Sequence, residues 1–465
     1  MKHFIATFWA VLACLVAAAQ TDLPQVFSPN AAELGKYGKI PVSYFNGLPN
    51  ITIPLTELRA KNYTLPIYLT YHAGGNKPDQ HPGWVGLGWT LHAGGCINRI
   101  VNVERDEMGR EEFTSLTGIG GPALTGYYKR SRSFQSAEID SLYMNQIANS
   151  RIPLDYAPDE FEINVDGLSS SFYLTGENEV RIKSKNPVSY QVRIDTAIKR
   201  NIPVYPSLTG RPAPSAIQYS YIRAIRVTDS WGVEYVFGDE ENALELTFVS
   251  RYSGTDGIGP MICHVDTWNL SRITLPNGET MRFEYVKAGK PIIEMDRHYQ
   301  EDAAWTMSQC GFHYNTDEDT YGSYSYTITS PSYLSRIYVE SSGKEVSFHV
   351  SPSIELGTNI NNEAFMQKCV RHVEHLSITD AMNGSYYNQL DSIVTSDGIY
   401  RITYTEDPGT RLKMMALSLG DARKDMGKYE MSYNPIPLPP YNSKHTDKWG
   451  FYSQSTVDDD MNPES

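Results

Sequence analysis

Two histidines and a glutamate lie close together in the segment RHVEHL, as His372, Glu374 and His375. Histidines three positions apart share one face of a helix, where their ring nitrogens could bind a metal ion such as zinc. The order differs from the H-E-x-x-H of zinc proteases, and no third ligand stands at a suitable spacing. In a strand, His372 and Glu374 share a face and His375 lies opposite. We therefore expect no metal site in this segment.

The segment NTDEDTYG places Asn315, Asp317 and Asp319 at alternate positions, as in calcium-binding loops. The sixth position of such a loop is glycine and the twelfth is glutamate, whereas this chain has Thr320 and Tyr326 there. We interpret the segment as a solvated acidic loop. Calcium binding near Asp317 and Asp319 is the alternative.

Motifs for catalysis are missing from the sequence. It contains no G-x-S-x-G elbow, phosphate-binding loop or dinucleotide fingerprint. Its carboxylates are too numerous to nominate the acid and base of a glycosidase. The segment YKRSRSF contains the basic residues Lys129, Arg130 and Arg132, where an anion could bind. Because the chain is acidic overall, we favour a solvated loop for this segment. We expect a non-enzymatic protein without catalytic, cofactor-binding or metal-binding residues.

The first nineteen residues have the pattern of a secretory signal peptide. Lys2 and His3 precede an apolar run, 4–19, that ends in three alanines. Cleavage before Gln20 is expected, and lipid attachment at Cys14 is the disfavoured alternative, because Cys14 lies inside the apolar run. No later segment resembles a transmembrane helix. We expect an exported protein that is periplasmic, on the cell surface or extracellular.

Charge and cysteine content narrow the partners. The formal net charge of −14 argues against nucleic acid and anionic lipid headgroups. The cysteines after the leader allow three disulfide pairings, and buried or unpaired thiols are equally compatible. No C-x-x-C spacing points to zinc. These cysteines are Cys96, Cys263, Cys310 and Cys369.

A hairpin pattern recurs along the chain. Each copy has apolar residues, a polar turn with glycine, and then alternating aromatic and apolar residues. Asn277-Gly278 and Asp397-Gly398 are strong turn signals, because both residue types tolerate positive φ. The copies are FEINVDGLSSSFYL (161–174), IRAIRVTDSWGVEYVF (222–237), LSRITLPNGETMRFEY (270–285), LSRIYVESSGKEVSFHV (334–350) and LDSIVTSDGIYRITY (390–404). We predict a mainly β fold of antiparallel sheets built from repeated hairpins, with long loop insertions.

Glycine is unusually placed in WVGLGWTLHAGG, residues 84–95. If this stretch is extended, Gly86 and Gly88 leave one face almost bare, which suits close approach of a ring or a neighbouring strand. A ligand against that face is the alternative. We therefore expect valine at either glycine to destabilise the fold. In YTLPIYLTY (63–71), alternation predicts a strand, with Pro66 at an edge or a strand end.

Domain boundaries follow from changes in these patterns. A short amphipathic helix is predicted over 136–148, with Ser136 as its cap. A polar insertion is expected over 288–330. We expect a signal peptide at 1–19, an amino-terminal β region at 20–155, hairpin regions at 156–287 and 288–434, and a proline-rich exit with a disordered acidic tail at 435–465.

Several segments together resemble the amino-terminal region of secreted bacterial RHS/YD-repeat proteins. They are GKYGKIPVSYFNGLPNITIPL, LPIYLTYHAGG, WVGLGWTLHAGGCINR, PDEFEINVDGLSSSFYL and DKWGFYS, spread from about Ser28 to Phe451. The resemblance implies a β shell, formed by downstream repeats around a variable toxin. Only YRITYTEDPGTRL is similar to such a repeat, which suggests a short or truncated member.

Three functions follow from these expectations. The first is an exported structural module of a surface or toxin-delivery protein, partnered by a downstream RHS/YD shell or other surface proteins. The second is a β module that binds a surface glycan or protein through an aromatic cleft. The third and least favoured is a hydrolase of cell-surface polymer, which requires two carboxylates facing each other across a groove.

Overall fold

The structure is a computed structural model that divides into two units, Met1–Ile51 and Thr52–Ser465. The strands below lie in the second unit, apart from Ile51 at the start of the first strand. No helix in the described residues is long and apolar enough to cross a membrane. The described residues are 48–49, 51–75, 77, 80–102, 105–107, 157–165, 168–175, 179–183, 191–195, 200–202, 217–219, 221–253, 257–258, 262–287, 292–299, 306–308, 311–313, 322–353, 387–405, 411–421, 425–438 and 451–452.

A small sheet contains β1 (Ile51–Ala60), β2 (Tyr63–Tyr71) and β3 (Trp89–His92), with β2 in the middle. Alternate side chains of β2 are buried, and Leu65, Ile67 and Leu69 are each at most 1% exposed. The period-two prediction is therefore confirmed. The prediction that Pro66 lies at an edge or a strand end is wrong, because it lies inside this middle strand. β3 pairs only with Tyr68 to Tyr71, so Pro66 stands before that ladder begins.

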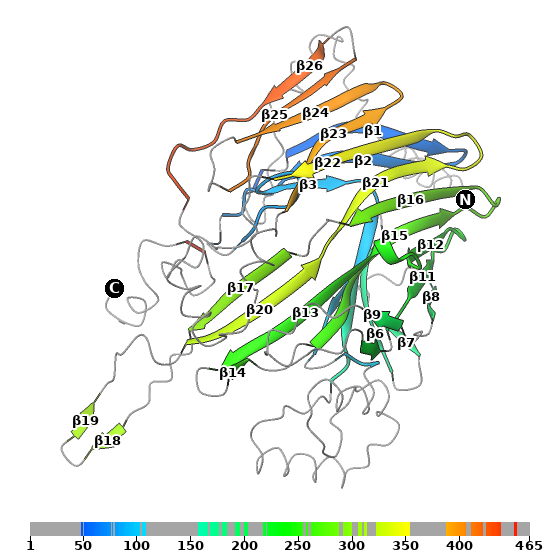
Figure 1. The fold of residues 1–465 in the computed structure, drawn as a ribbon. Helices are drawn as coiled ribbons and strands as arrows, with labels where there is room; N and C mark the ends of the chain where they lie inside the picture. The colour runs from blue at the N-terminus through cyan, green and yellow to red at the C-terminus, as the bar shows by residue number, and fades with distance from the viewer. Residues whose placement is uncertain are drawn as a thin grey trace, which may run out of the picture. The chain divides into compact units, whose positions relative to one another are not determined.

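The remaining sheet is antiparallel and branches at β15 (Figure 1). The carboxy-terminal part of β15, from Leu270, pairs with β12 and β16, which starts the first branch. The strands of this branch, in order, are β8 (Gln191–Asp195), β11 (Ala224–Thr228), β12 (Glu234–Gly238), β15 (Ile262–Thr274), β16 (Thr280–Lys287), β21 (Ser332–Val339), β22 (Glu345–Pro352), β23 (Asn388–Thr395), β24 (Gly398–Tyr404), β25 (Met414–Gly420) and β26 (Asp425–Glu430).

The amino-terminal part of β15, up to Asn269, pairs with β4 and β13 and starts the second branch. Its other strands in order are β7 (Val180–Lys183), β6 (Leu168–Leu174), β5 (Glu160–Val165), β4 (Gly95–Ile100), and then, beyond β15, β13 (Leu244–Ser253), β20 (Gly322–Ser330) and β17 (Ile292–Tyr299), with β14 (Gly257–Ile258) on β13. The remaining elements are the pairs β9 (Arg200–Ile202) with β10 (Ile217–Tyr219) and β18 (Thr306–Ser308) with β19 (Gly311–His313), and the 3-10 helix η1 (Glu241–Ala243).

All the predicted hairpins form. They are β5–β6, β11–β12, β15–β16, β21–β22 and β23–β24. At the β15–β16 turn, Gly278 has a φ of +83° and its amide donates to the Leu275 carbonyl at 2.8 Å. A glycine there adopts positive φ at no steric cost, which is the reason the turn signal was informative.

Trp268 lies in β15 beside the branch point and is completely buried. Its indole Nε1 donates to the Ile222 carbonyl at 2.7 Å, so the polar end of the ring is satisfied. Its ring lies 5.7 Å from that of Phe161, which stacks on Phe172 at 4.9 Å. These three rings form an aromatic core between β15 and the β5–β6 hairpin of the second branch.

The expectation of an extended chain from Trp84 is wrong for its first half, because β3 begins only at Trp89. Two successive turns precede the strand: the Gly86 amide donates to the Gly83 carbonyl at 2.9 Å, and the Trp89 amide to the Gly86 carbonyl at 3.1 Å. Gly86 and Gly88 have φ values of +94° and +77°. Glycine is favoured there by positive φ as well as by close contact.

Several predictions fall outside the described residues. These are the signal peptide, the helix over 136–148, and the boundaries at 155 and 288. The segment 288–330 was expected to be a polar insertion. Its described parts include β17 and β20, which pair from Ile292 to Tyr299 and extend the second branch.

Candidate functional site

The glycine turns place Trp84 against the first branch. The Trp84 carbonyl accepts a hydrogen bond from the Leu390 amide at 2.8 Å, and the Leu87 amide donates to the Leu412 carbonyl at 2.8 Å. The Trp84 ring is tilted against the rings of Tyr333, at 6.0 Å, and Phe348, at 6.4 Å. One face of the indole is thereby held by the core while the side chain stays partly exposed.

A second pair of glycines connects β3 to β4. A Cβ atom on Gly95 would lie 2.4 Å from the Asn164 carbonyl oxygen, and one on Gly94 would lie 3.2 Å from the Phe283 ring. The chain passes so close to β5 that no side chain fits at Gly95. Gly94 and Gly95 therefore present backbone without side chains between the glycine turns and the β5–β6 hairpin.

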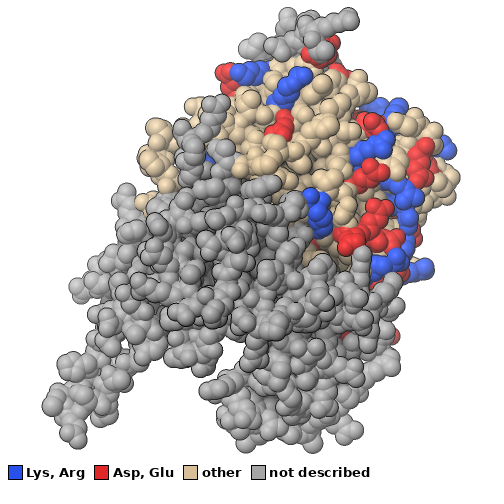
Figure 2. Space-filling model, in the orientation of Figure 1, with Lys and Arg blue, Asp and Glu red and all other residues tan. Residues whose placement is uncertain are grey.

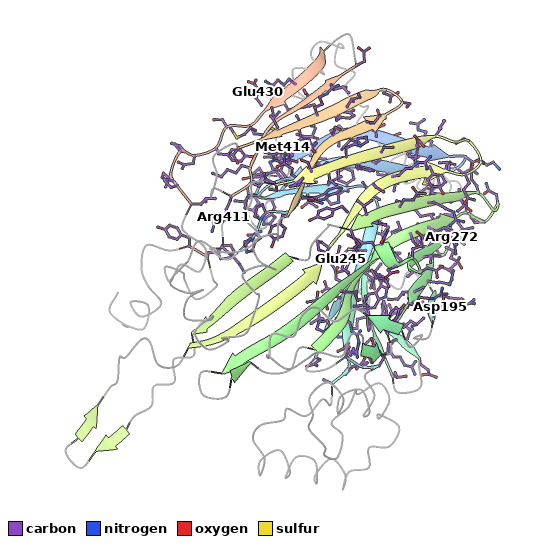
Figure 3. The ribbon with its side chains drawn as sticks, in the orientation of Figure 1. Asp195, Glu245, Arg272, Arg411, Met414 and Glu430 are labelled. Atoms are coloured by element: carbon purple, nitrogen blue, oxygen red, sulfur yellow. The ribbon has the colours of Figure 1, made fainter. Side chains whose placement is uncertain are left out.

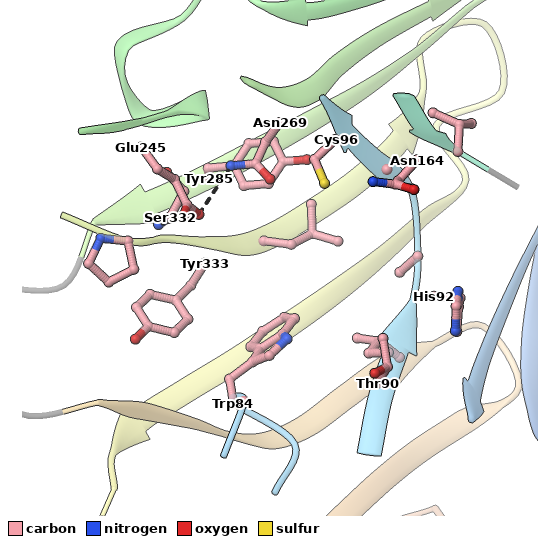
Figure 4. Close-up of a pocket in the computed structure, with 18 of the residues that line it drawn as sticks. Trp84, Thr90, His92, Cys96, Asn164, Glu245, Asn269, Tyr285, Ser332 and Tyr333 are labelled. Carbon is pink, nitrogen blue, oxygen red and sulfur yellow. Dashed lines mark hydrogen bonds between the residues drawn. The ribbon is translucent and has the colours of Figure 1, made fainter. Parts of the chain in front are cut away.

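A cavity of about 770 Å³ lies between these segments (Figure 4). Its described lining comes from the glycine turns, β2, β3, β4, the β5–β6 hairpin, β13, β15, β16, β20, the start of β21, and Tyr387 before β23. In the close-up, Glu245, Tyr285, Asn269 and Asn164 lie in the upper part, and Tyr333, Trp84, Thr90 and His92 lie below them. We call it the Glu245 cavity.

Glu245 lies in β13, near the meeting point of the two branches (Figure 3). Its Oε1 atom accepts hydrogen bonds from Asn269 Nδ2 at 3.3 Å and from the Ser332 amide at 3.1 Å. Burial raises the pKa of this carboxyl group, and the Ser332 amide and Lys287 oppose the rise. Its second oxygen, Oε2, has no hydrogen bond from the described residues.

Lys287 stands behind this carboxyl group. Its Nζ atom donates to Ser332 Oγ at 2.9 Å and to the Leu244 carbonyl. Burial lowers the pKa of Lys287 to about 8, against the attraction of Glu245. The Lys287 ammonium lies where it can offset negative charge on the Glu245 carboxyl group.

Cys96 and Tyr285 are among the other titratable residues that line the Glu245 cavity. Burial raises the pKa of the Cys96 thiol to about 11, with a smaller rise from Glu245. Burial also raises the pKa of Tyr285, whose hydroxyl donates to the Leu270 carbonyl at 2.8 Å. Both groups are protonated at neutral pH and are poor nucleophiles in that form. The lining is suited to hydrogen bonding and ring contact.

A buried ion cluster lies where β4 leaves the sheet and β5 enters it. Arg99 Nη1 donates to Glu107 Oε1 at 2.8 Å, and Arg99 Nε donates to Asp159 Oδ2 at 2.8 Å. The guanidinium also lies 5.3 Å from the centre of the Phe161 ring. The Arg99 and Asp159 side chains are completely buried. Breaking such a pair leaves an unpaired buried charge, so the cluster fixes the two chain segments together.

Asp106 completes this cluster. Its amide donates to Asp159 Oδ2 at 3.0 Å, and the Asp159 amide donates back to Asp106 Oδ2 at 3.1 Å. Burial and the Asp159 carboxylate raise the pKa of Asp106 to about 9. Asp106 is therefore protonated at neutral pH, which avoids two like charges side by side.

Charges on the described surface are mixed in sign (Figure 2). Several are paired between strands: Arg336 Nε lies 2.9 Å from Glu345 Oε2 on the neighbouring strand, and Lys183 Nζ in β7 lies 2.9 Å from Glu160 Oε2 in β5, across β6. Exposed pairs of this kind contribute little to stability. They support strand register and leave no patch of one sign on the described part of this face.

The residues singled out by sequence for metal or anion binding lie outside the described part of the chain. Within that part, no group of three or more His, Cys, Asp or Glu side chains is arranged to hold a metal ion. The residues singled out are Lys129, Arg130, Arg132, Asn315, Asp317, Asp319, His372, Glu374 and His375; Cys14, the alternative site of lipid attachment, also lies outside the described part. Glu245 and the Arg99 cluster belong to no recognised motif and were not anticipated.

No protein-family model matches the chain, and no match is found among the curated proteins. Among solved structures, it is similar to the N-terminal domain of effector protein SpvB from Salmonella typhimurium strain LT2, with 11% identity over 83% of this chain and 99% of that chain and a TM-score of 0.26. It is also similar to TcdB2-TccC3-Cdc42, with 13% identity over 80% of this chain and 14% of that chain and a TM-score of 0.26.

The Tc holotoxin pore of Photorhabdus luminescens gives 11% identity over 80% of this chain and 15% of that chain, with a TM-score of 0.29. The chain thus spans about one seventh of the two Tc structures' length. These weak structural neighbours are toxin components. At such TM-scores the overlap does not define a shared fold.

Proposed function

We propose that this chain is an exported, non-enzymatic structural module, of the kind that forms the amino-terminal part of RHS/YD-repeat surface or toxin-delivery proteins. The resemblance of the sequence segments suggests the family. The proposal does not depend on any catalytic group. It is supported by how the chain uses its many tyrosines.

The tyrosine hydroxyls tie distant backbone segments together. Tyr400 Oη in β24 donates to the Leu55 carbonyl in β1, which is 345 residues away in the sequence. Tyr433 Oη donates to the Met414 carbonyl at 2.7 Å and accepts from Trp89 Nε1 at 3.1 Å. Rings fixed in this way stabilise a rigid β framework. This use of tyrosine is the observation that carries the structural proposal.

A reporter fusion tests the structural and export parts together. The full chain, with its leader, is fused at its carboxyl end to β-lactamase and expressed in a bacterium that exports proteins. We expect exported lactamase activity and resistance of the module to added protease. The purified protein is also assayed against peptidoglycan, polysaccharides and peptides, and no turnover is expected.

Gly86→Val supplies the folding control, because it should lower the exported and protease-resistant fraction together. Retention of the reporter in the cytoplasm would contradict export. Reproducible turnover of any polymer would contradict a non-enzymatic role. Rapid proteolysis of the unaltered module would contradict a rigid framework.

A binding module for a surface glycan or protein is the second candidate. The Glu245 cavity favours it, because its lining combines the aromatic rings of Trp84, Tyr285 and Tyr333 with polar groups such as Glu245, Asn269 and Asn164. Ligand sites commonly combine apolar and aromatic walls with a few placed polar groups.

A further inference from the structure

We infer that the Glu245 cavity binds a neutral sugar ring, a hexopyranose unit of a glycan. The inference rests on the binding role given above as the second candidate, and it is independent of the structural proposal. It follows from the charge, the two walls and the size of the cavity.

Charge selects a neutral ligand. Glu245 is the only carboxylate among the described lining residues, and no lysine or arginine lies among them. The Lys287 ammonium behind Glu245 shares a partner with it at Ser332, so the carboxylate is already balanced from the protein side. The described lining therefore offers no lysine, arginine or second carboxylate that would favour a charged ligand over a neutral one.

The aromatic wall suits the apolar face of a pyranose. The rings of Trp84 and Tyr333 are 6.0 Å apart with their planes 56° from parallel. Tyr333 is buried and Trp84 is half-buried, so Trp84 supplies most of the accessible aromatic surface. Tyr333 is itself fixed, because its hydroxyl accepts a hydrogen bond from the Asn388 amide at 3.1 Å. A rigid aromatic surface loses little entropy when a ligand binds.

The polar wall offers groups that match sugar hydroxyls. Glu245 Oε2 is an acceptor without a hydrogen bond from the described residues. Asn164 and Ser169 lie opposite each other on β5 and β6, and both are exposed toward the cavity. The Asn164 carboxamide, with no hydrogen-bond partner among the described residues, can both donate and accept. A sugar hydroxyl needs this combination, because it also donates and accepts.

The size agrees with this class of ligand. A volume of about 770 Å³ falls within the range of roughly 300 to 1,000 Å³ that is usual for small-molecule sites. It is large enough for one sugar ring and part of a neighbouring ring. The ligand can therefore be a terminal unit of a longer glycan.

Binding is tested on the purified full chain with defined probes. The neutral probes are the methyl glycosides of glucose, galactose, mannose and N-acetylglucosamine, with lactose, cellobiose and chitobiose as disaccharides. Glucosamine and choline serve as cationic probes, and glucuronate as the anionic one. Saturation-transfer NMR detects binding at up to about 10 mM ligand, and calorimetry gives Kd. We expect at least one neutral probe to bind at least about tenfold more tightly than every charged probe.

Two variants locate the site, and one provides a matched control. Asn164→Ala and Glu245→Gln should each raise Kd by about 3- to 10-fold, as expected for losing one hydrogen bond. Asn242→Ala should leave Kd unchanged, because Asn242 is an exposed asparagine that does not line the cavity. Thermal melts of every variant establish that the protein is folded.

The inference is overturned if no neutral probe binds a chain that melts cooperatively. Tighter binding of choline, glucosamine or glucuronate overturns it as well, as does binding that Asn164→Ala leaves unaffected. If no sugar binds but the reporter fusion is exported normally, only the binding role is rejected. If the fusion is not exported but the purified chain binds sugar, only the structural proposal is rejected.

Discussion

The backbone nitrogen of Met414 lies 2.8 Å from the position that a Cβ atom on Gly86 would occupy. Gly86 also has a φ of +94°, which an L side chain rarely adopts. The first glycine turn is therefore held directly against the backbone at the start of β25. The requirement for close approach was predictable from the sequence, but the partner was not.

Gly86→Ala should lower the free energy of unfolding by about 2 to 4 kcal/mol, because backbone strain and the collision with Met414 add together. Gly278→Ala is the matched control. Gly278 has a similar φ of +83° but no atom within 4 Å of its would-be Cβ. It should cost only about 1 kcal/mol, from strain alone. Urea unfolding measures both, and equal losses would show that contact with Met414 is unimportant.

Tyr404→Phe tests the tyrosine hydroxyls. Tyr404 Oη donates to the carbonyl of fully buried Leu390 at 2.7 Å, so phenylalanine leaves a buried acceptor without this donor. We expect a loss of about 1 to 2 kcal/mol in the free energy of unfolding. Tyr429→Phe is the control, since Tyr429 is 51% exposed, and it should have almost no effect. A neutral Tyr404→Phe would weaken the structural proposal.

The hairpins were predictable because their signals are local. Asn277-Gly278 and the period-two pattern after it lie within one hairpin, and nothing distant had to be known. The conformation of Trp84–Gly88 was not predictable. Glycine suits both an extended strand that permits close approach and a turn with positive φ, so the sequence alone does not distinguish them.

The candidate site was hidden for a different reason. Glu245 meets Asn269 across 24 residues and the Ser332 amide across 87 residues. Similarly, Arg99 meets Asp159 across 60 residues. The Glu245 contacts join strands that are far apart in the sequence, and Arg99 meets Asp159 because β4 and β5 are neighbouring strands. None of these contacts leaves a periodic or spaced motif in the sequence.

Asp106→Asn should change how stability depends on pH. The folded chain keeps the Asp106 proton up to a pKa of about 9, whereas the ordinary value is 3.8. Between these values the folded state binds more protons than the unfolded state, so Asp106 makes stability fall as pH rises. The slope from one such proton is at most about 1.4 kcal/mol per pH unit.

Urea unfolding of both proteins at intervals from pH 5 to about pH 8 measures this slope. The asparagine variant has no proton to lose, so its stability should fall less across the range. Subtracting the two curves removes the contributions of other groups, including Lys287. Parallel curves would mean that Asp106 is already ionised in the folded protein.

Cys96 should react slowly with alkylating reagents at neutral pH. Its pKa of about 11 leaves very little thiolate, and the thiolate is the reactive form. We expect iodoacetamide labelling of Cys96 in the folded chain at pH 7 to be at least about tenfold slower than in urea-unfolded chain, and to accelerate toward pH 9. Peptide mass spectrometry follows Cys96 separately from the other cysteines. Equal labelling rates in the folded and unfolded chains would show that burial does not suppress thiolate formation in the Glu245 cavity.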